Sequence, residues 1–416
     1  MPDVEEVRVA ELAGRWRLLA ILATAELLAF APWFSSSAVA PLLQEDWEMG
    51  RLDLPFLTVA VQLGFAAGAL LLAATGAADV IRPRYLLAAG AFLAAVANLG
   101  FAGLATDTAS AIPFRVITGA ALACVYPVAI KVLAGWFGRE RGLAVGVLVG
   151  ALTIGSALPF LFRALGSLSG ADWHAIVAIA SVAAIVGGFV ALAGVRDGPN
   201  DVRAPRFSLS MAARAFSHPS VRLANLGYLG HMWELYAMWT WVPLFLAASF
   251  AAGGVADASL ASLGAFVVVA AGGLGCMAAG MLADRAGRTT ITMIAMACSG
   301  LSALAIGLLF GAAPWLTLLL GIFWGITVVA DSAQFSVAVS ELAPPGTAGS
   351  ALAIQTAFGF ILTSVTILMI GALAPADGVG WQVAFGLLAI GPAVGIVAMG
   401  RLRSRPDAVL MANGNR

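Results

Sequence analysis

The sequence predicts an all-α membrane protein with twelve transmembrane helices, arranged as two pseudo-symmetric six-helix bundles. Its 416 residues are 61% hydrophobic and only 11% charged, whereas a soluble domain has about 25% charged residues. Apolar runs of about 20 residues, the length that crosses a bilayer, recur along the whole chain. Features of the first half of the chain also return in the second half at a nearly constant offset.

Twelve apolar segments are long enough to cross a membrane, and polar stretches separate them. A polar stretch after the sixth segment divides the chain into a first bundle, residues 1–195, a cytoplasmic linker, residues 196–220, and a second bundle, residues 221–416. The predicted segments are approximately 18–40, 55–77, 85–105, 111–134, 142–164, 173–195, 221–249, 259–281, 290–311, 315–338, 349–372 and 381–401.

The basic residues predict the orientation of these segments. A cytoplasmic N-terminus places all of the 22 Lys and Arg residues on the cytoplasmic side except Arg51, Arg115, Lys131 and Arg163. Cytoplasmic loops carry the excess of lysine and arginine. We therefore expect a multi-pass protein of the cytoplasmic (inner) membrane, in contact with the lipid bilayer, with both termini in the cytoplasm.

Two features of the first half are repeated in the second. Asp79 and Asp284 each follow the second segment of their half, 205 positions apart (284 − 79). The stretch from Glu26 to Trp33 aligns with the stretch from Glu234 to Trp241 at an offset of 208 (234 − 26), with glutamate, leucine, alanine and tryptophan coinciding. This repeat predicts two parallel six-helix halves.

The loop at residues 280–288 reads Gly-Met-Leu-Ala-Asp-Arg-Ala-Gly-Arg. Its glycines suit a tight turn between two membrane helices. The loop resembles the cytoplasmic loop signature of the major facilitator superfamily of membrane transporters, and residues 76–84 are a degenerate copy that lacks the final glycine and arginine. The resemblance implies that both loops control the conformation of the cytoplasmic ends. The residues expected to do so are Asp79, Arg82, Gly280, Asp284, Arg285, Gly287 and Arg288.

The fourth and fifth segments extend this resemblance. Arg115 and Gly119 match an arginine, three residues, glycine pattern of the superfamily. The fifth segment has small residues at a spacing that lets helices approach closely. It resembles the glycine-proline motif of superfamily exporters only loosely, because the dipeptide itself is missing. This difference favours uptake by symport over efflux by antiport, without excluding the latter.

Two ionisable residues of the first half lie inside predicted membrane segments, where charge is costly. Glu26 shares a helical face with Phe30 and Trp33. It is expected to bind a proton or a cationic group, or else to hydrogen-bond a neighbouring helix. Arg115 lies about one turn inside the outer surface. It could pair with an embedded acid, attract an anionic substrate, or extend to the outer interface, as Lys131 is expected to do at the inner one.

The second half contributes three more ionisable candidates. His231 and Glu234 lie three residues apart in the seventh segment, so a proton could pass between them. We expect Glu234 to face Glu26 across a central cavity. Asp331 lies in the tenth segment and could bind substrate or protons, or support helix packing. The other residues proposed for substrate or proton binding are Trp33, Tyr228, Trp241, Trp324 and Gln334.

Together these features predict a secondary active transporter that moves a small-molecule organic solute by alternating access, driven by protons. The first, second, seventh, eighth and eleventh segments have no interior basic residue, so a neutral, weakly acidic or cationic solute fits better than a phosphorylated one. The alternatives are a proton-coupled efflux antiporter for drugs or metabolites, and a non-transporting membrane sensor or assembly factor on the same fold.

Several properties are expected to be absent. The three cysteines have no metal-ligand spacing, no nucleotide-binding loop occurs, and the formal net charge is zero. We therefore predict no metal, no cofactor, no nucleic-acid partner and no enzymatic activity. A monomer is the expectation that the resemblance implies.

Overall fold

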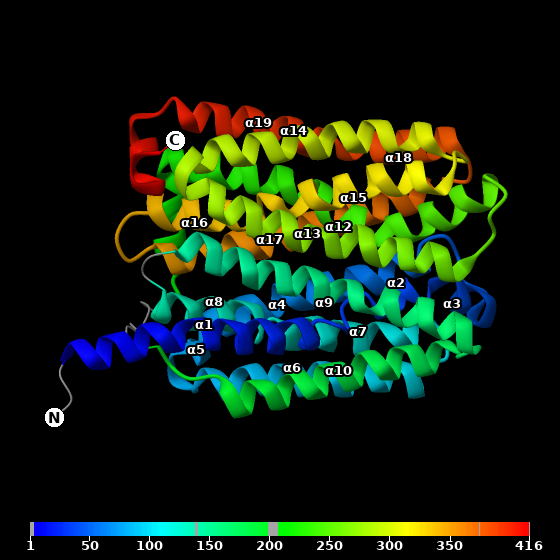
Figure 1. The fold of residues 1–416 in the computed structure, drawn as a ribbon, viewed down its shortest axis with the longest axis horizontal. Coiled ribbons are helices and arrows are strands. Elements are labelled where there is room, and N and C mark those ends of the chain that lie inside the picture. Colours follow the sequence, from blue (N-terminus) through cyan, green and yellow to red (C-terminus); the bar gives the residue numbers. More distant parts are fainter. Residues whose placement is uncertain (1–3, 138–139, 199–206, 374, 416) are drawn as a thin grey trace.

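The computed structural model describes residues 4–137, 140–198, 207–373 and 375–415, and this part of the chain is helical with no strand. The helices run along the long axis of one elongated body, and both termini lie at the same end (Figure 1). We call this the terminal end and the opposite one the distal end. Helices α1 to α10, the first half, lie below helices α12 to α19, the second half, in this view.

The twelve predicted segments all correspond to helices or to pairs of consecutive helices. Eleven spans in the described residues are long and apolar enough to cross a membrane. The first half contains α1 (Val4–Ala29), α2 (Ser35–Ala38), α3 (Ala40–Trp47), α4 (Asp53–Thr75), α5 (Ala77–Val80), α6 (Pro83–Leu104), α7 (Thr108–Leu122), α8 (Tyr126–Trp136), α9 (Arg141–Ser169) and α10 (Trp173–Gly194).

The second half continues the pattern. Helix α11 (Leu209–Ser217) lies within the predicted linker, of which residues 199–206 are outside the described part. The remaining helices are α12 (Pro219–Ala252), α13 (Ala258–Ala286), α14 (Arg288–Ile306), α15 (Pro314–Ala330), α16 (Ser332–Leu342), α17 (Ala348–Leu373), α18 (Gly378–Leu388) and α19 (Ile390–Arg403), with the short 3₁₀ helices η1 (Gly307–Leu309), η2 (Pro406–Leu410) and η3 (Ala412–Gly414).

The first predicted segment is not one continuous helix, which corrects the prediction for residues 18–40. Helix α1 ends at Ala29, and α2 begins only at Ser35. Pro32 lies in this break, and proline removes a backbone donor and disfavours the helical conformation of the residue before it. The tenth segment is also divided, at Asp331 between α15 and α16. The first break lies beside the buried Arg115, and the second lies at the buried Asp331.

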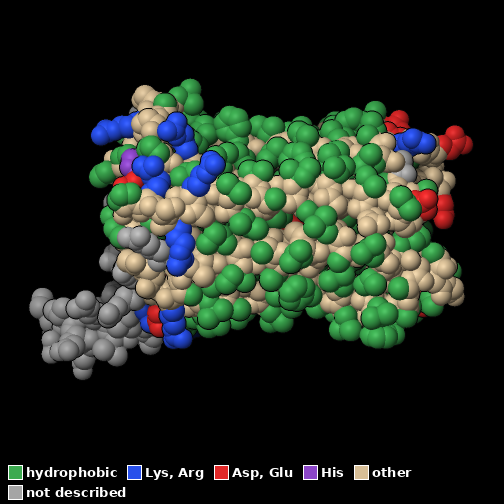
Figure 2. Space-filling view, turned by 90° about the horizontal axis from the view of Figure 1, so that it is seen from above, with side chains coloured by type: hydrophobic (Ala, Val, Ile, Leu, Met, Phe, Trp, Pro, Cys, Tyr) green, Lys and Arg blue, Asp and Glu red, His purple; other side chains and the backbone are tan. Residues whose placement is uncertain are grey.

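Charge separates between the two ends of the molecule. On the face that Figure 2 shows, most Lys and Arg side chains gather at the terminal end and most Asp and Glu at the distal end, with a wide hydrophobic band between them. Part of the distal acidity has a local cause, because aspartates accept hydrogen bonds from the first backbone N–H groups of four helices. These N-caps are Asp107, Asp172, Asp257 and Asp377.

The two halves meet most extensively where α9 packs on α13, and again where α4 packs on α17. Glycines make the first contact possible, as the spacing in the fifth segment predicted. A Cβ atom added at Gly146 would lie 2.6 Å from the carbonyl oxygen of Cys276, and one added at Gly280 would lie 2.5 Å from that of Gly142. Any side chain at these positions would force the halves apart.

Candidate functional site

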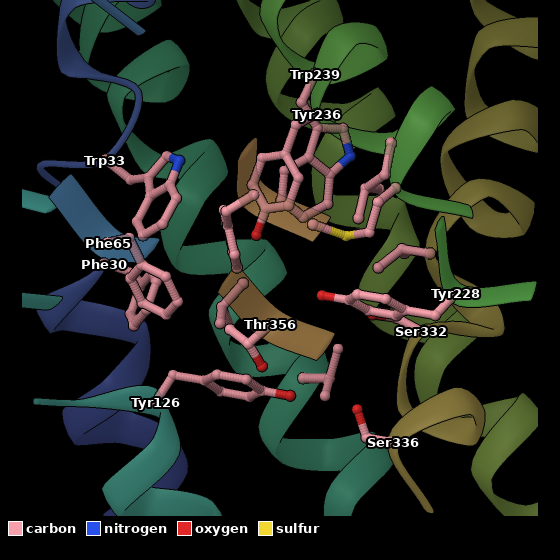
Figure 3. A pocket seen from close by; sticks show the side chains of 16 residues that line it. Phe30, Trp33, Phe65, Tyr126, Tyr228, Tyr236, Trp239, Ser332, Ser336 and Thr356 are labelled. Atoms are coloured by element: carbon pink, nitrogen blue, oxygen red, sulfur yellow. The ribbon is translucent and has the colours of Figure 1, made fainter. Parts of the chain in front are cut away.

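A central cavity of about 50 Å³ lies between the two halves (Figure 3). Both halves contribute to its wall, the first through the break after α1 and through α4, α8 and α9, and the second through α12, α15, α16 and α17. The sixteen lining residues are Phe30, Trp33, Phe65, Tyr126, Val149, Leu152, Tyr228, Met232, Leu235, Tyr236, Trp239, Val329, Ser332, Ser336, Thr356 and Phe360.

Aromatic rings connect the halves at this cavity. The ring of Trp33 lies 5.1 Å from that of Phe65 within the first half. Across the interface it lies 5.8 Å from the rings of both Tyr236 and Phe360. Phe65 and Phe360 are closer still, with ring centroids 4.5 Å apart. Such pairs stabilise a closed arrangement beyond the area that they bury.

Hydroxyl groups form the polar part of the wall. In Figure 3 the hydroxyls of Tyr126 and Tyr228 point into the cavity from opposite sides, with that of Ser336 beside them. The chain has only four tyrosines, and three of them line this space. Tyr228 was predicted from the sequence, whereas Tyr126 and Tyr236 were not. Both could have been found, because tyrosine is scarce in this chain. Tyr126 follows the Arg115 and Gly119 pattern, and Tyr236 lies within the repeated stretch from Glu234 to Trp241.

Glu26 lies one helical turn before the cavity residue Phe30. Its side chain is 1% exposed, and neither carboxylate oxygen has a hydrogen-bond partner among the described residues. Burying an ionised carboxylate without a partner costs several kcal/mol. Protonation removes that cost, so the position is suited to taking up and releasing a proton.

The carboxylate of Glu234 is directed away from the cavity, into the second half. One oxygen accepts from Trp324 Nε1 at 2.7 Å, and the other accepts from Ser299 Oγ at 2.8 Å. The expectation that Glu234 faces Glu26 across the cavity is therefore wrong. The helical repeat aligned the two residues correctly along the sequence, but α14 and α15 offer donors that draw Glu234 towards them.

His231 pairs with Asp331 instead of relaying to Glu234. His231 Nδ1 lies 2.9 Å from Asp331 Oδ1, and both side chains are almost completely buried. Asp331 occupies the break between α15 and α16, next to the cavity residue Ser332. The pair thus lies directly behind the cavity wall, where the sequence had placed both residues without joining them.

Trp241 does not line the central cavity. It borders a second, more open cavity of about 310 Å³ near the distal end, together with Arg51 and Trp381. Its indole nitrogen donates to the carbonyl of Ile367 at 3.2 Å.

The comparison with known proteins decides the family. The family model of the Major Facilitator Superfamily matches residues 22–367. The chain belongs to the major facilitator superfamily.

Known members share this fold. The proton:xylose symporter XylE bound to 6-bromo-6-deoxy-D-glucose superposes with a TM-score of 0.72 over 94% of this chain and 96% of that one, at 14% identity. A bacterial homologue of the human lysosomal transporter Spinster, in an inward-facing and unoccupied conformation, gives a TM-score of 0.68 at 16% identity, covering 94% of this chain and 99% of that chain. A glycerol-3-phosphate transporter of Bacillus subtilis (strain 168) is 27% identical over 169 residues, 40% of this chain and 37% of the relative.

The superfamily loop at residues 280–288 organises the terminal end of the second half. Arg288 forms two hydrogen bonds of 2.7 Å with the carboxylate of Glu341 and donates to Gln334 Oε1 at 2.8 Å. It also lies 3.4 Å from Asp284. Gly287 ends α13 with φ of 92°, a conformation that favours glycine. Gln334 thus belongs to this network instead of to the cavity.

In the degenerate loop of the first half, residues 76–84, Asp79 pairs with a lysine. Lys131 lies 2.7 Å from Asp79 and also donates to the carbonyl of Ala78. The ammonium of Lys131 thus reaches the loop at the terminal end, on the side where the inner interface is predicted. The side chains of Arg82 and Arg285 are exposed.

Arg115, in the fourth membrane segment of this superfamily member, holds the break after α1. Its guanidinium donates to the carbonyls of Pro32 and Trp33 at 3.1 and 2.6 Å, and to Ser35 Oγ and Asn98 Oδ1 at 3.0 Å each. The side chain is completely buried, so it does not reach the outer interface. Its partners among the described residues are backbone carbonyls and neutral side chains, instead of the embedded acid that the sequence suggested. By binding these carbonyls, Arg115 fixes the position of Trp33 in the cavity wall.

Proposed function

We propose that the protein is a secondary active transporter that moves a small organic solute across the cytoplasmic membrane by alternating access. The observation that supports this most is a cavity lined by both halves, with close contacts between the halves towards each end. Gly142 meets Gly280 near the terminal end, and Pro55 meets Gly371 near the distal end. Opening either contact would expose the same cavity to one side only, which is what alternating access requires.

The terminal end is proposed to be cytoplasmic. Lys and Arg side chains gather there on the face shown in Figure 2, and cytoplasmic loops carry the excess of these residues. The domain boundaries at 195 and 220 belong to the same proposal, with each bundle moving as one body about the cavity.

Proton coupling is proposed to act through Glu26, with the His231–Asp331 pair as a second proton site. Glu26 is buried without a partner beside the cavity, so its charge depends on the access of water. Opening of the halves hydrates it and permits proton release, while closure favours the protonated form. Uptake by symport follows if solute and proton must both be bound before the cavity closes.

The test is accumulation by the purified protein in proteoliposomes. A defined mixture of metabolites is offered under an imposed inward proton gradient, and mass spectrometry identifies what enters. Accumulation should require the gradient and should stop in Glu26→Gln, whereas gradient-independent exchange of the same solute continues. Glu48→Gln changes an exposed glutamate and serves as the matched control.

Three other results of this experiment would contradict parts of the proposal. Accumulation by Glu26→Gln at the normal level would exclude Glu26 as the coupling site. Uptake driven by an outward proton gradient would identify antiport. Failure to move any solute, combined with intact folding, would favour a sensor or assembly role.

A further inference from the structure

The central cavity has an uncharged wall. Among its sixteen lining residues there is no Asp, Glu, Lys, Arg or His. The buried acids nearby are turned away, because Glu234 is bound by Trp324 and Ser299 and Asp331 lies against His231. Glu26, the remaining buried acid beside the cavity, carries no charge when it is protonated. An anionic solute would therefore lose its hydration without gaining an opposite charge, a cost of several kcal/mol.

The wall is divided into an aromatic side and a hydroxyl side. Figure 3 shows Trp33, Tyr236 and Trp239 together at the top of the cavity, and Tyr126 and Ser336 at the bottom. Trp33 and Trp239 are fully buried, and their indole N–H groups have no partner in the described part of the chain. The aromatic side therefore offers flat apolar surface, and the hydroxyl side offers groups that both donate and accept.

On the basis of the proposed transport function, we propose that this cavity selects an uncharged cyclic solute that carries hydroxyl groups. The flat face of such a ring can stack on the aromatic side while its substituents bond the hydroxyl side. Its phosphate ester or carboxylate would be rejected, because recognition of those anions calls for Arg or Lys. This chemistry differs from that of the partial match, whose name specifies glycerol-3-phosphate.

The cavity must widen to take this solute. Its volume of about 50 Å³ holds a few water molecules at most, whereas ligand pockets have about 300–1,000 Å³. The rings that bridge the halves, Trp33, Phe65 and Phe360, are the ones that must separate. Their faces then become available for stacking with the solute.

The test is equilibrium binding to the purified full chain in lipid nanodiscs, measured by tryptophan fluorescence and thermal stabilisation. The probes are pyranoses, cyclitols and simple phenols, each beside its phosphorylated or carboxylated counterpart. At least one uncharged ring should bind and its charged counterpart should not. Tyr126→Phe, Tyr228→Phe and Tyr236→Phe keep the rings and remove single hydroxyls. Those whose hydroxyl contacts the probe should weaken binding about five- to tenfold, the loss of one net hydrogen bond.

Tyr85→Phe is the matched control, because Tyr85 is 47% exposed on α6 and should leave binding unchanged. Tighter binding of a charged counterpart, or binding unaffected by all three cavity variants, overturns the inference. So does failure of every uncharged ring to bind. These outcomes leave transport intact, since accumulation of a charged solute in proteoliposomes would still establish a transporter. Ring binding without any transport would instead sustain the inference and overturn the proposed function.

Discussion

Gly146→Ala should open the terminal end of the transporter. The added Cβ would lie 2.6 Å from the carbonyl oxygen of Cys276 and 3.4 Å from the Cα of Met277. Carbon–oxygen contacts of about 3.3–3.6 Å are usual, so α9 and α13 must separate by at least roughly 0.7 Å. Overpacking of this kind costs about 1–3 kcal/mol.

That cost applies only to the conformation in which these helices touch. The gain in helix propensity from alanine, about 1 kcal/mol, is present in every conformation and cancels. A difference of about 1–3 kcal/mol between two conformations shifts their ratio about 5- to 150-fold. We therefore expect the population open at the terminal end to rise by this factor.

A cysteine in the cavity reports the shift. Ser336→Cys is placed in a background that lacks Cys124, Cys276 and Cys298, and its rate of reaction with a membrane-impermeant maleimide is measured from each side of the membrane. Gly146→Ala should raise the rate from the terminal side by the factor above and lower the rate from the distal side.

Two further glycines provide the controls. At Gly371 an added Cβ would lie 2.5 Å from Pro55 Cγ, so Gly371→Ala should shift accessibility in the opposite direction. Gly103→Ala should change nothing, since a Cβ there meets no atom within 4 Å. Equal labelling rates in Gly146→Ala and the parent protein would refute the idea that this contact closes the cavity.

Three other outcomes are expected. Arg115→Met should lower the melting temperature strongly, because it leaves buried acceptors without a donor, at a cost of about 1–3 kcal/mol each. The melting temperature of Arg115→Lys should lie between those of Arg115→Met and the parent protein. A wild-type melting temperature for Arg115→Met would contradict the network. A thermal double-mutant cycle on His231→Asn and Asp331→Asn should show a coupling of about 0.5–3 kcal/mol, whereas additive effects would mean that the 2.9 Å contact is not energetically significant. Hydrogen bonds from the Ser110 backbone N–H and hydroxyl hold the pKa of Asp107 below its ordinary value. The cap therefore contributes its full stabilisation at pH values above the ordinary pKa, and this stabilisation is lost as the pH falls through the lowered pKa. The melting-temperature difference between Asp107→Ala and the parent should therefore shrink below about pH 4, and a constant difference would argue against the cap.

The path of the chain through the membrane could be predicted from the sequence because it depends on local quantities. Segment length and apolar content locate the spans, and the repeat of Asp79 at Asp284 relates the halves. The break after Ala29 was missed although Pro32 was visible. Proline often persists within membrane helices when neighbouring groups satisfy the freed carbonyls, and only the structure shows that Arg115 does so here.

The candidate site was predicted in part. Glu26, Trp33, Tyr228 and the helices that carry them were recognised, because ionisable and aromatic residues on one helical face mark a membrane interior. Their partners could not be predicted, since a helix fixes only the direction in which a side chain leaves the backbone. Neighbouring helices decide the rest, as Ser299 and Trp324 show by drawing the carboxylate of Glu234 away from the cavity.

The sequence by itself determined the family, the number of membrane segments and the residue types available for chemistry. Only the tertiary structure decided which of these residues line the cavity between the halves. The physical reason is that a buried polar group is positioned by the partner that satisfies it, and these partners come from helices distant in the sequence. The predicted pair of Glu26 and Glu234 facing each other is therefore absent, and aromatic rings and hydroxyls line the cavity instead, with Glu26 buried and unpaired beside it.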